Sequence, residues 1–302
     1  MYTLIAENKY SEQLELTHNP AYNITDIDGI DPAEAVINVS KNAGADGSVF
    51  NSAYVNDRQI VITLSVNAPT ETNRIALYKF FKPKFPVTLY YQNATRNVYI
   101  NGYVQNVAVG FFDKKQTVQI TINCPQPFFN GLYTKVQECS NVESLFEFPF
   151  SIEESTAPIV GQAVVGTDSL GGESGGIEFS RLLDYFEATI FNDGDVETGA
   201  LITIKASGAV DTPKIYNVET NESFIINTTL QAGDLVTINT RRGEKALTLL
   251  RNGVTIPLIG SLAEGSTWFQ LVPSDNVFTL DADSGVENML VTFTINDQYE
   301  GV

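Results

Sequence analysis

Short runs in which apolar and polar residues alternate fill most of the chain, and they predict β-strands. The clearest run follows Arg58, where Ile60, Ile62 and Leu64 take every second position. This is the period of a strand that buries one face. Other short runs rich in Val, Ile, Thr and Tyr are at 86–91, 96–104, 107–112 and 117–123. The first 130 residues are therefore expected to be mainly β.

The block at 24–64 is dense in Asp and Gly, and its pattern predicts a strand, a long glycine-rich turn and a second strand. The turn contains Ala-Asp-Gly-Ser at 45–48, where Gly47 supplies the positive φ that a tight reversal needs. Because the most distinctive residues fall in a turn between strands, we expect this block to act through shape and assembly.

One segment, 70–81, predicts a helix. It follows Pro69, carries Glu71 in its first turn and Lys79 near its end, and stops before Pro83, which are the usual helix boundary signals. The expected apolar face comprises Ile75, Tyr78 and, in addition, Leu77 and Phe81. Packing of this helix against a sheet or barrel is expected.

From residue 186 onward, the second half of the chain again contains short runs typical of β-strands. Nine short runs separated by turn residues are at 186–192, 200–208, 213–218, 223–230, 234–240, 245–253, 267–272, 276–283 and 288–297. This arrangement predicts an antiparallel β-sandwich.

Charge supports a boundary near residue 130. The chain has a net charge of −18; residues 1–130 carry ten Lys/Arg and eleven Asp/Glu, and the rest carry eight and 25. Two prolines in the 123–131 run also end a strand. We expect domains at 1–131 and 186–302, joined by a linker or excursion at 132–185. The acidic second half argues against nucleic-acid binding there, because phosphates are neutralised by Lys and Arg.

Residues with catalytic or metal-binding chemistry are scarce. The single histidine, His18, has no nucleophile motif around it. The acidic turn at 26–31 lacks the glycine and glutamate spacing of a calcium loop. Cys124 and Cys139 are expected to be buried, free thiols and not to form a disulfide with each other. We therefore expect no enzyme activity and no catalytic, cofactor or metal site. Packing is favoured over sugar binding for Trp268, the only tryptophan.

The ordered combination of these segments resembles a known family. ITDIDGIDP, GADGSVF, NDRQIVITL, the helix, KPKFPVTLYY, INGYVQNV and TVQITINCPQPFF resemble the first domain of the distal tail proteins (Dit) of siphovirus-type phages and prophages. The runs LQAGDLVTINTRRGEKALTLLRNG, STWFQLVPSDNVFTLDADSG and VTFTINDQYEGV resemble the second domain. The resemblance covers about 22–130 and 186–302, whereas 132–185 resembles nothing in the family.

The resemblance implies a mainly β protein: a tail-tube-like β-barrel with one flanking α-helix, followed by a galectin-like antiparallel β-sandwich. It also implies a structural hub of the tail tip, a homo-hexameric ring with a channel through which genomic DNA passes. The implied partners are the tail tube protein, the tail-associated tip protein, the tape measure protein and receptor-binding or baseplate proteins.

The expected location is the distal end of the tail in the virion, with assembly in the host cytoplasm. The N-terminal residues do not read as a signal peptide and no apolar run is long enough to span a bilayer, so direct membrane insertion is not expected. A lectin-like, carbohydrate-binding adhesin is the alternative, and a cell-wall hydrolase is a weaker one. The galectin-like label does not imply sugar binding, because the sandwich has no histidine.

The ring is expected to form through residues 1–130, whose near-neutral charge suits packing between copies. The turn at 44–54 and the helix at 70–81 are the expected contact elements. The candidate assembly contacts are Asp46, Gly47, Phe50, Tyr54, Arg58, Arg74 and Tyr78.

Overall fold

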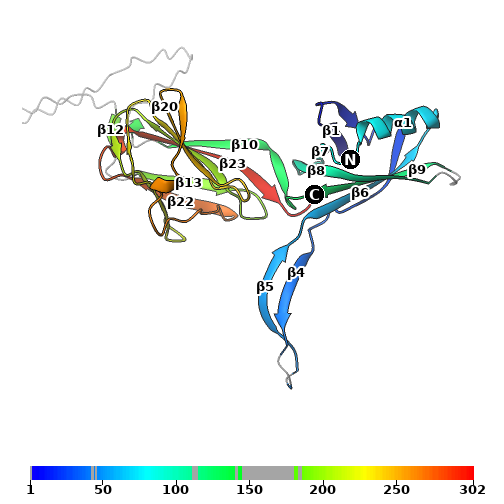
Figure 1. Cartoon of the computed structure of the whole chain (residues 1–302), viewed down its shortest axis with the longest axis horizontal. Coiled ribbons are helices and arrows are strands. Elements are labelled where there is room, and N and C mark those ends of the chain that lie inside the picture. Colours follow the sequence, from blue (N-terminus) through cyan, green and yellow to red (C-terminus); the bar gives the residue numbers. More distant parts are fainter. Residues whose placement is uncertain are drawn as a thin grey trace, which may run out of the picture.

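The computed structural model describes residues 2–41, 44, 46–110, 115–139, 142–144, 180–182 and 186–302. Within these residues the chain is mainly β with one α-helix, as expected. Two bodies are joined by two long strands, and a β-hairpin projects from the first body (Figure 1). No helix of the described residues is both long and apolar enough to cross a membrane.

The first body, called here the N-terminal unit, contains nine strands and the helix α1 (Thr70–Phe80). The strands are β1 (Thr3–Asn8), β2 (Gln13–Glu15), β3 (Tyr22–Asp28), β4 (Ala35–Ser40), β5 (Val49–Val55), β6 (Arg58–Val66), β7 (Pro86–Gln92), β8 (Asn97–Gly110) and β9 (Thr117–Cys124).

Seven of these strands form one antiparallel sheet in the order β2-β1-β7-β8-β9-β6-β3. The inward side chains of this sheet, among them the predicted Ile60, Ile62 and Leu64, form one buried apolar cluster. The sheet is an open barrel, since the described ladders do not join β2 to β3.

The helix α1 has nearly the predicted bounds, but its buried face differs from the expected one. Leu77 and Phe81 are fully buried against the sheet, whereas Ile75 is 40% exposed. Positions 77 and 81 are one helical turn apart and share a face, and Ile75 lies on another. The Phe81 N–H donates to the carbonyl of Leu77 at 2.8 Å and closes the helix.

The block at 24–64 contains more regular structure than the sequence pattern predicted. The expected long turn between β3 and β6 is itself a β-hairpin formed by β4 and β5. The runs AVINVS and VFNSAYV have strand-forming compositions, and Gly44 and Gly47 adopt positive φ at the tip. Only the tip is therefore the glycine-rich turn.

The second body is the expected β-sandwich. Its strands are β10 (Phe129–Cys139), β13 (Phe186–Asn192), β14 (Ala200–Ala206), β15 (Val210–Asp211), β16 (Lys214–Asn217), β17 (Glu222–Ile225), β18 (Thr229–Leu230), β19 (Leu235–Asn239), β20 (Ala246–Arg251), β21 (Val254–Pro257), β22 (Ser274–Asp281) and β23 (Met289–Tyr299). Two short 3-10 helices are η1 (Ile259–Ser261) and η2 (Val286–Asn288).

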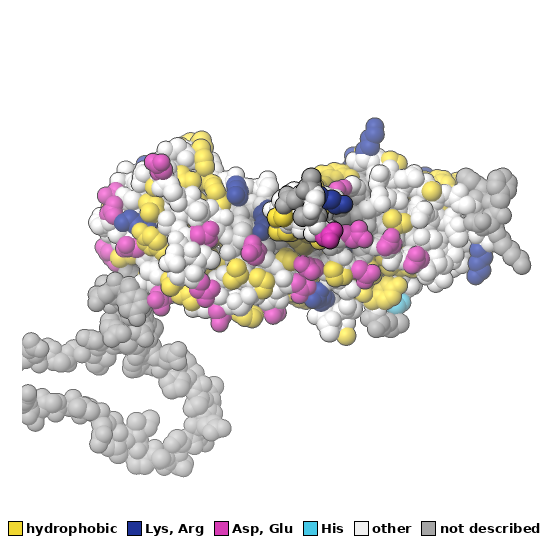
Figure 2. Space-filling model, turned by 90° about the horizontal axis from the view of Figure 1, so that it is seen from below, with side chains coloured by type: hydrophobic (Ala, Val, Ile, Leu, Met, Phe, Trp, Pro, Cys, Tyr) yellow, Lys and Arg dark blue, Asp and Glu magenta, His cyan; other side chains and the backbone are white. Residues whose placement is uncertain are grey.

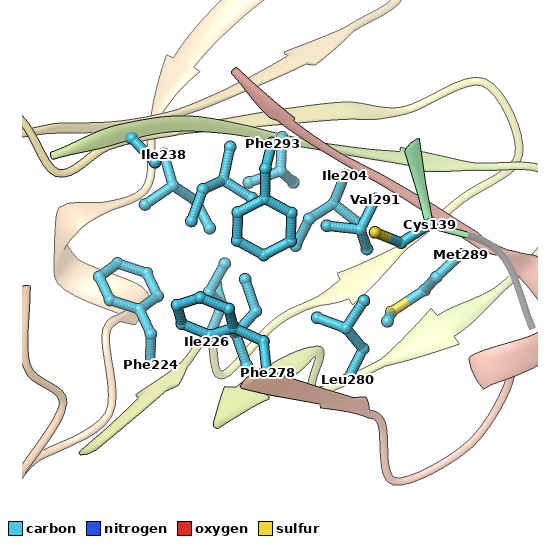
Figure 3. Packing of buried hydrophobic residues seen from close by; sticks show 14 of the residues in the cluster. Cys139, Ile204, Phe224, Ile226, Ile238, Phe278, Leu280, Met289, Val291 and Phe293 are labelled. Carbon is cyan, nitrogen blue, oxygen red and sulfur yellow. The ribbon is translucent and has the colours of Figure 1, made fainter. Parts of the chain in front are cut away.

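Two antiparallel sheets, β10-β23-β14-β19-β20-β21 and β13-β22-β16-β17, pack face to face. Figure 3 shows Phe278 of one sheet against Phe293 of the other, with ring centroids 5.1 Å apart. The predicted strand at 267–272 is wrong, because residues 266–270 lack strand structure. Phe269 is nevertheless buried there, since its ring packs on Phe278 at 5.0 Å.

The two bodies share strands. The β10 strand begins in the N-terminal unit, where Phe129 is buried, and ends in the sandwich at buried Cys139. The expected boundary near 130 thus lies at the start of a strand. Of the expected linker at 132–185, residues 132–139 belong to β10, and β11 (Val142–Ser144) pairs with β12 (Ser180–Leu182). The other residues of that segment lie outside the described ones.

Candidate functional site: an exposed hairpin held by a buried arginine

The β4–β5 hairpin is exposed over almost its whole length. Its strands pair only with each other and project away from both bodies (Figure 1). Isolated two-stranded hairpins are marginally stable in water. The hairpin therefore presents a surface that gains stability when something covers it.

One face of the hairpin is entirely apolar. The register pairs Ile37 with Ala53 and Val39 with Phe50, and opposed residues of antiparallel strands share a face. A register shift after Asn38 brings Phe50 onto the face of Val39. Following this register, the apolar hairpin face consists of Ala35, Ile37, Val39, Phe50, Ala53 and Val55.

The apolar hairpin face is open to solvent: Phe50 is 63% exposed and Ile37 is 62% exposed. Tyr54 lies on the opposite face, opposite Val36. There the Asn38 amide donates to the Ser52 hydroxyl at 3.0 Å. The two predicted aromatic contacts, Phe50 and Tyr54, thus face opposite directions.

The hairpin is electrically neutral. Between residues 35 and 55 the only charged side chains are Lys41 and Asp46. The predicted Asp46 and Gly47 lie at the tip, and no atom lies within 4 Å of a Cβ added to Gly47. The tip therefore makes little contact with the rest of its own chain.

The base of the hairpin is held by Arg58, which is only 4% exposed. Its guanidinium donates to the carbonyls of Gly29 at 2.7 Å and Asp31 at 2.6 Å. It also donates to the carbonyls of Pro127 and Glu300. One side chain thus connects the chain before β4, the approach to β10 and the C-terminus.

Burial and bonding define the role of Arg58. Burial lowers its pKa, while the negative charges of neighbouring groups, Asp31 and Glu300 among them, act in the opposite direction. The guanidinium also lies over the Phe129 ring at 4.8 Å. The sequence prediction treated Arg58 as an assembly contact; the structure places it beneath the hairpin.

Close packing at Gly29 fixes the same region. Gly29 has φ +84° and a Cβ there would lie 2.1 Å from the Gln59 carbonyl oxygen. Only glycine fits between the end of β3 and β6. Glycine at position 29 thus has a packing reason. Among the described residues there is no group of three His, Cys, Asp or Glu side chains able to hold a metal ion.

The two remaining candidates lie on α1, apart from the hairpin (Figure 1). Arg74 forms an ion pair with Glu71 at 2.6 Å and lies over the Tyr78 ring at 5.7 Å. The seven predicted contacts therefore form two separate groups, one on the hairpin and its base and one on the helix.

The structure adds residues that the sequence reasoning missed. Ile37, Val39 and Val49 are exposed apolar residues of the hairpin, and the alternation in VINVS was the available signal. Arg96 forms an ion pair with Asp195 at 2.9 Å and lies over the Tyr299 ring at 4.6 Å. It links the N-terminal unit to the sandwich, a contact with no local sequence signal.

Trp268 and the cysteines take packing roles. The Trp268 ring meets the Phe224 ring edge-on at 5.1 Å, as the preference for packing predicted. Cys124 and Cys139 are buried and free, as expected. Burial raises the pKa of Cys124 to about 12 and that of Cys139 to about 11, so both thiols stay protonated and unreactive at neutral pH.

Comparison with family models assigns the chain. Residues 11–124 match the phage tail protein RIFT-related domain, and residues 193–296 match the C-terminal domain of the siphovirus-type tail component called SPP1 Dit. The chain belongs to the distal tail protein family of siphovirus-type phages. The resemblance inferred from the sequence is thereby confirmed. This distal tail protein is accordingly a structural component of a phage tail.

Two solved structures share the fold of this distal tail protein. The crystal structure of SPP1 Dit (gp 19.1), described as a paradigm of hub adsorption apparatus in Gram-positive infecting phages, matches with a TM-score of 0.65. Sequence identity is 14%, and the match covers 99% of each chain. A chain of the phage P2 baseplate in its activated conformation with Ca matches at 0.52, with 14% identity and full coverage of both chains. A search of curated proteins finds no match.

Proposed function

We propose that this protein is the ring-forming hub of the tail tip. Six copies form a ring that joins the tail tube to the tip and leaves a channel through which DNA passes. The observation that carries the proposal is the neutral hairpin, whose apolar face is exposed and whose base is fixed by Arg58. The hub description of SPP1 Dit supports the same reading.

The distribution of charge supports an outward position for the sandwich. Residues 131–302 carry 25 Asp/Glu and eight Lys/Arg, whereas residues 1–130 are nearly neutral. Carboxylates are scattered over the face seen in Figure 2, the side on which the hairpin projects. Close packing of six copies is easier through neutral surfaces, because like charges repel. Residues 1–131 are therefore assigned to the ring and residues 186–302 to its periphery.

The proposed partners are those that the family resemblance implies. The ring unit contacts further copies of this chain, the tail tube protein, and the tip and tape measure proteins. The sandwich docks receptor-binding or other baseplate proteins. Genomic DNA is only passing cargo. Of the seven predicted contacts, Asp46, Gly47, Phe50 and Tyr54 contribute directly through the hairpin, Arg58 supports it, and Arg74 and Tyr78 act from α1.

The test is a substitution on the apolar hairpin face. Phe50→Asp removes a large exposed side chain and places a charge on that face, which costs roughly 1.5–3 kcal/mol of apolar burial at each contact before the charge is counted. Each contact is expected to weaken at least tenfold. Light scattering coupled to size exclusion measures ring formation by the full chain.

Val254→Asp is the matched control, because Val254 is similarly exposed but lies on β21 of the sandwich. Rings should persist in this variant. Rings of normal stability in both variants would contradict the assignment of the ring contact to the hairpin. Monomers in both variants would mean that any added charge disrupts assembly, and the hairpin would lose its special role.

A further inference from the structure

To be covered, the apolar hairpin face needs a complementary surface. The N-terminal unit has such a surface on a part of its sheet that is distant from the hairpin in the strand order. A groove of about 300 Å³ lies on the outer face of β1, β7 and β8, next to the start of β10. Its apolar walls are Ile5, Tyr90 and Leu132, and its polar rim includes Thr3, Gln92 and Asn97. This set of six residues is called the Leu132 groove.

The strand register explains the composition of the Leu132 groove. Ile5 lies directly opposite Tyr90, and both point to the outer face of the sheet. Leu4 and Ala6, on either side of Ile5 along β1, point into the core. Thr3, Gln92 and Asn97 form the adjoining row across the same three strands. The groove thus has an apolar centre bordered by hydroxyl and amide groups.

The occupant of this groove must come from another molecule. The hairpin leaves the sheet between β3 and β6, at the opposite end of the strand order from β1 and β7. It projects away from that end (Figure 1), so it cannot fold back onto the groove of its own chain. A contact between two different surfaces of identical copies is heterologous, the type that closes into rings.

Charge favours a second copy of this chain as the occupant. Nearly all of the net charge of −18 lies in residues 131–302, so two copies repel each other mainly through their second halves and approach most easily through the nearly neutral N-terminal units. The residues that line the groove are uncharged, and one carboxylate borders them: Glu7 accepts hydrogen bonds from Tyr90 and from Gln13, which also lines the groove. The hairpin strands carry no charge on the apolar hairpin face. These two surfaces therefore meet with little electrostatic cost and bury Phe50, Ile37 and Leu132 together.

We propose that the apolar hairpin face of one copy packs into the Leu132 groove of the next copy around the ring. This proposal rests on the proposed function, since it assumes that the chain forms a ring. It names the acceptor surface for the hairpin, with Phe50 seated between Ile5, Tyr90 and Leu132 of the neighbour.

Disulfide trapping in the full chain tests whether the hairpin of one copy packs into the Leu132 groove of the next. Ala53→Cys places a thiol on the apolar hairpin face, and Gln92→Cys or Asn97→Cys places one on the groove rim. The native Cys124 and Cys139 are buried and do not compete. Mild oxidation should give a ladder of covalent oligomers at least about tenfold faster than random collision between the same thiols, because the ring holds the two thiols together.

Ser52→Cys with the same rim cysteines is the matched control, since Ser52 is adjacent in sequence but lies on the opposite hairpin face. It should give no ladder. Two results would overturn the inference while the proposed ring itself stands, provided that rings are visible by microscopy. One is that Ala53→Cys gives no covalent oligomers with either rim cysteine. The other is that Ser52→Cys gives as many covalent oligomers as Ala53→Cys. The absence of rings in the unmodified chain would instead refute the proposed function on which it rests.

A second variant tests the groove without cysteines. Leu132→Asp introduces a charge at the apolar centre, whereas Tyr133→Asp changes a more exposed neighbour outside the groove. Leu132→Asp is expected to lower ring formation at least tenfold while thermal unfolding of the monomer is unchanged. Tyr133→Asp should leave rings intact, and equal assembly of the two variants would contradict the proposal.

Discussion

Replacement of Arg58 by alanine tests whether this residue supports the hairpin from within its own chain. The guanidinium donates four hydrogen bonds to backbone carbonyls and is nearly inaccessible to solvent. A buried carbonyl that loses its donor costs about 1–3 kcal/mol. In Arg58→Ala, water that enters the space left by the side chain satisfies part of this loss, so the substitution is expected to cost about 3–5 kcal/mol of unfolding free energy.

Differential scanning calorimetry measures this loss in the full chain. At about 2–4 °C per kcal/mol, the melting temperature of the N-terminal unit should fall by roughly 6–20 °C. Trp268 is the only tryptophan and lies in the sandwich, so its fluorescence reports that body separately and should shift less. Arg58→Lys keeps the charge but loses the planar set of donors, and an intermediate loss is expected.

Arg242→Ala is the control, because Arg242 forms a mostly exposed ion pair with Glu197. Exposed pairs contribute about 0–1 kcal/mol, so this variant should melt close to the wild type. A shift below about 2 °C for Arg58→Ala would refute the supporting role. Loss of rings with unchanged stability would instead identify Arg58 as a contact between subunits, as the sequence alone suggested.

Two further predictions concern packing and pH. Gly29→Ala should destabilise the chain by several times the cost of Gly47→Ala, which is about 1 kcal/mol. The added methyl group at 29 collides with the Gln59 carbonyl, whereas position 47 is open; equal melting temperatures would contradict this. Arg251 hydrogen-bonds buried Asp234 and lowers the pKa of its carboxyl below 3.8. The stability advantage of wild type over Asp234→Asn should therefore be full above about pH 5 and decline as the pH falls through the lowered pKa of Asp234; a constant difference in urea unfolding across this range would count against it.

Local patterns predicted the elements whose core faces follow a simple period. The alternation of Ile60, Ile62 and Leu64 predicted β6, and the boundary residues predicted α1 to within one residue. The orientation of α1 was not predictable from its own residues, because both Leu77 and Ile75 are apolar and only packing against the rest of the N-terminal unit buries Leu77 and leaves Ile75 exposed. The segment around Trp268 has strand composition but no neighbouring strand to pair with along its length, so it remains irregular.

The position of the candidate site along the chain was predictable from the sequence, but its structure was not. Gly47 and its neighbours indicated the turn, yet the hairpin behind it depends on a register shift that sets Phe50 and Tyr54 on opposite faces. The burial of Arg58 depends on carbonyls 27 to 242 residues away in the chain. Long-range bonding of this kind leaves no local pattern, which is why the burial of Arg58 was not predictable from the sequence.

Microscopy of the purified full-length protein tests the central claim most directly. Negative-stain images at increasing protein concentration should show six-fold rings with an open centre, peripheral sandwiches and a population that grows with concentration. A protein that remains monomeric at every concentration, or that forms closed assemblies without a central channel, would contradict the account.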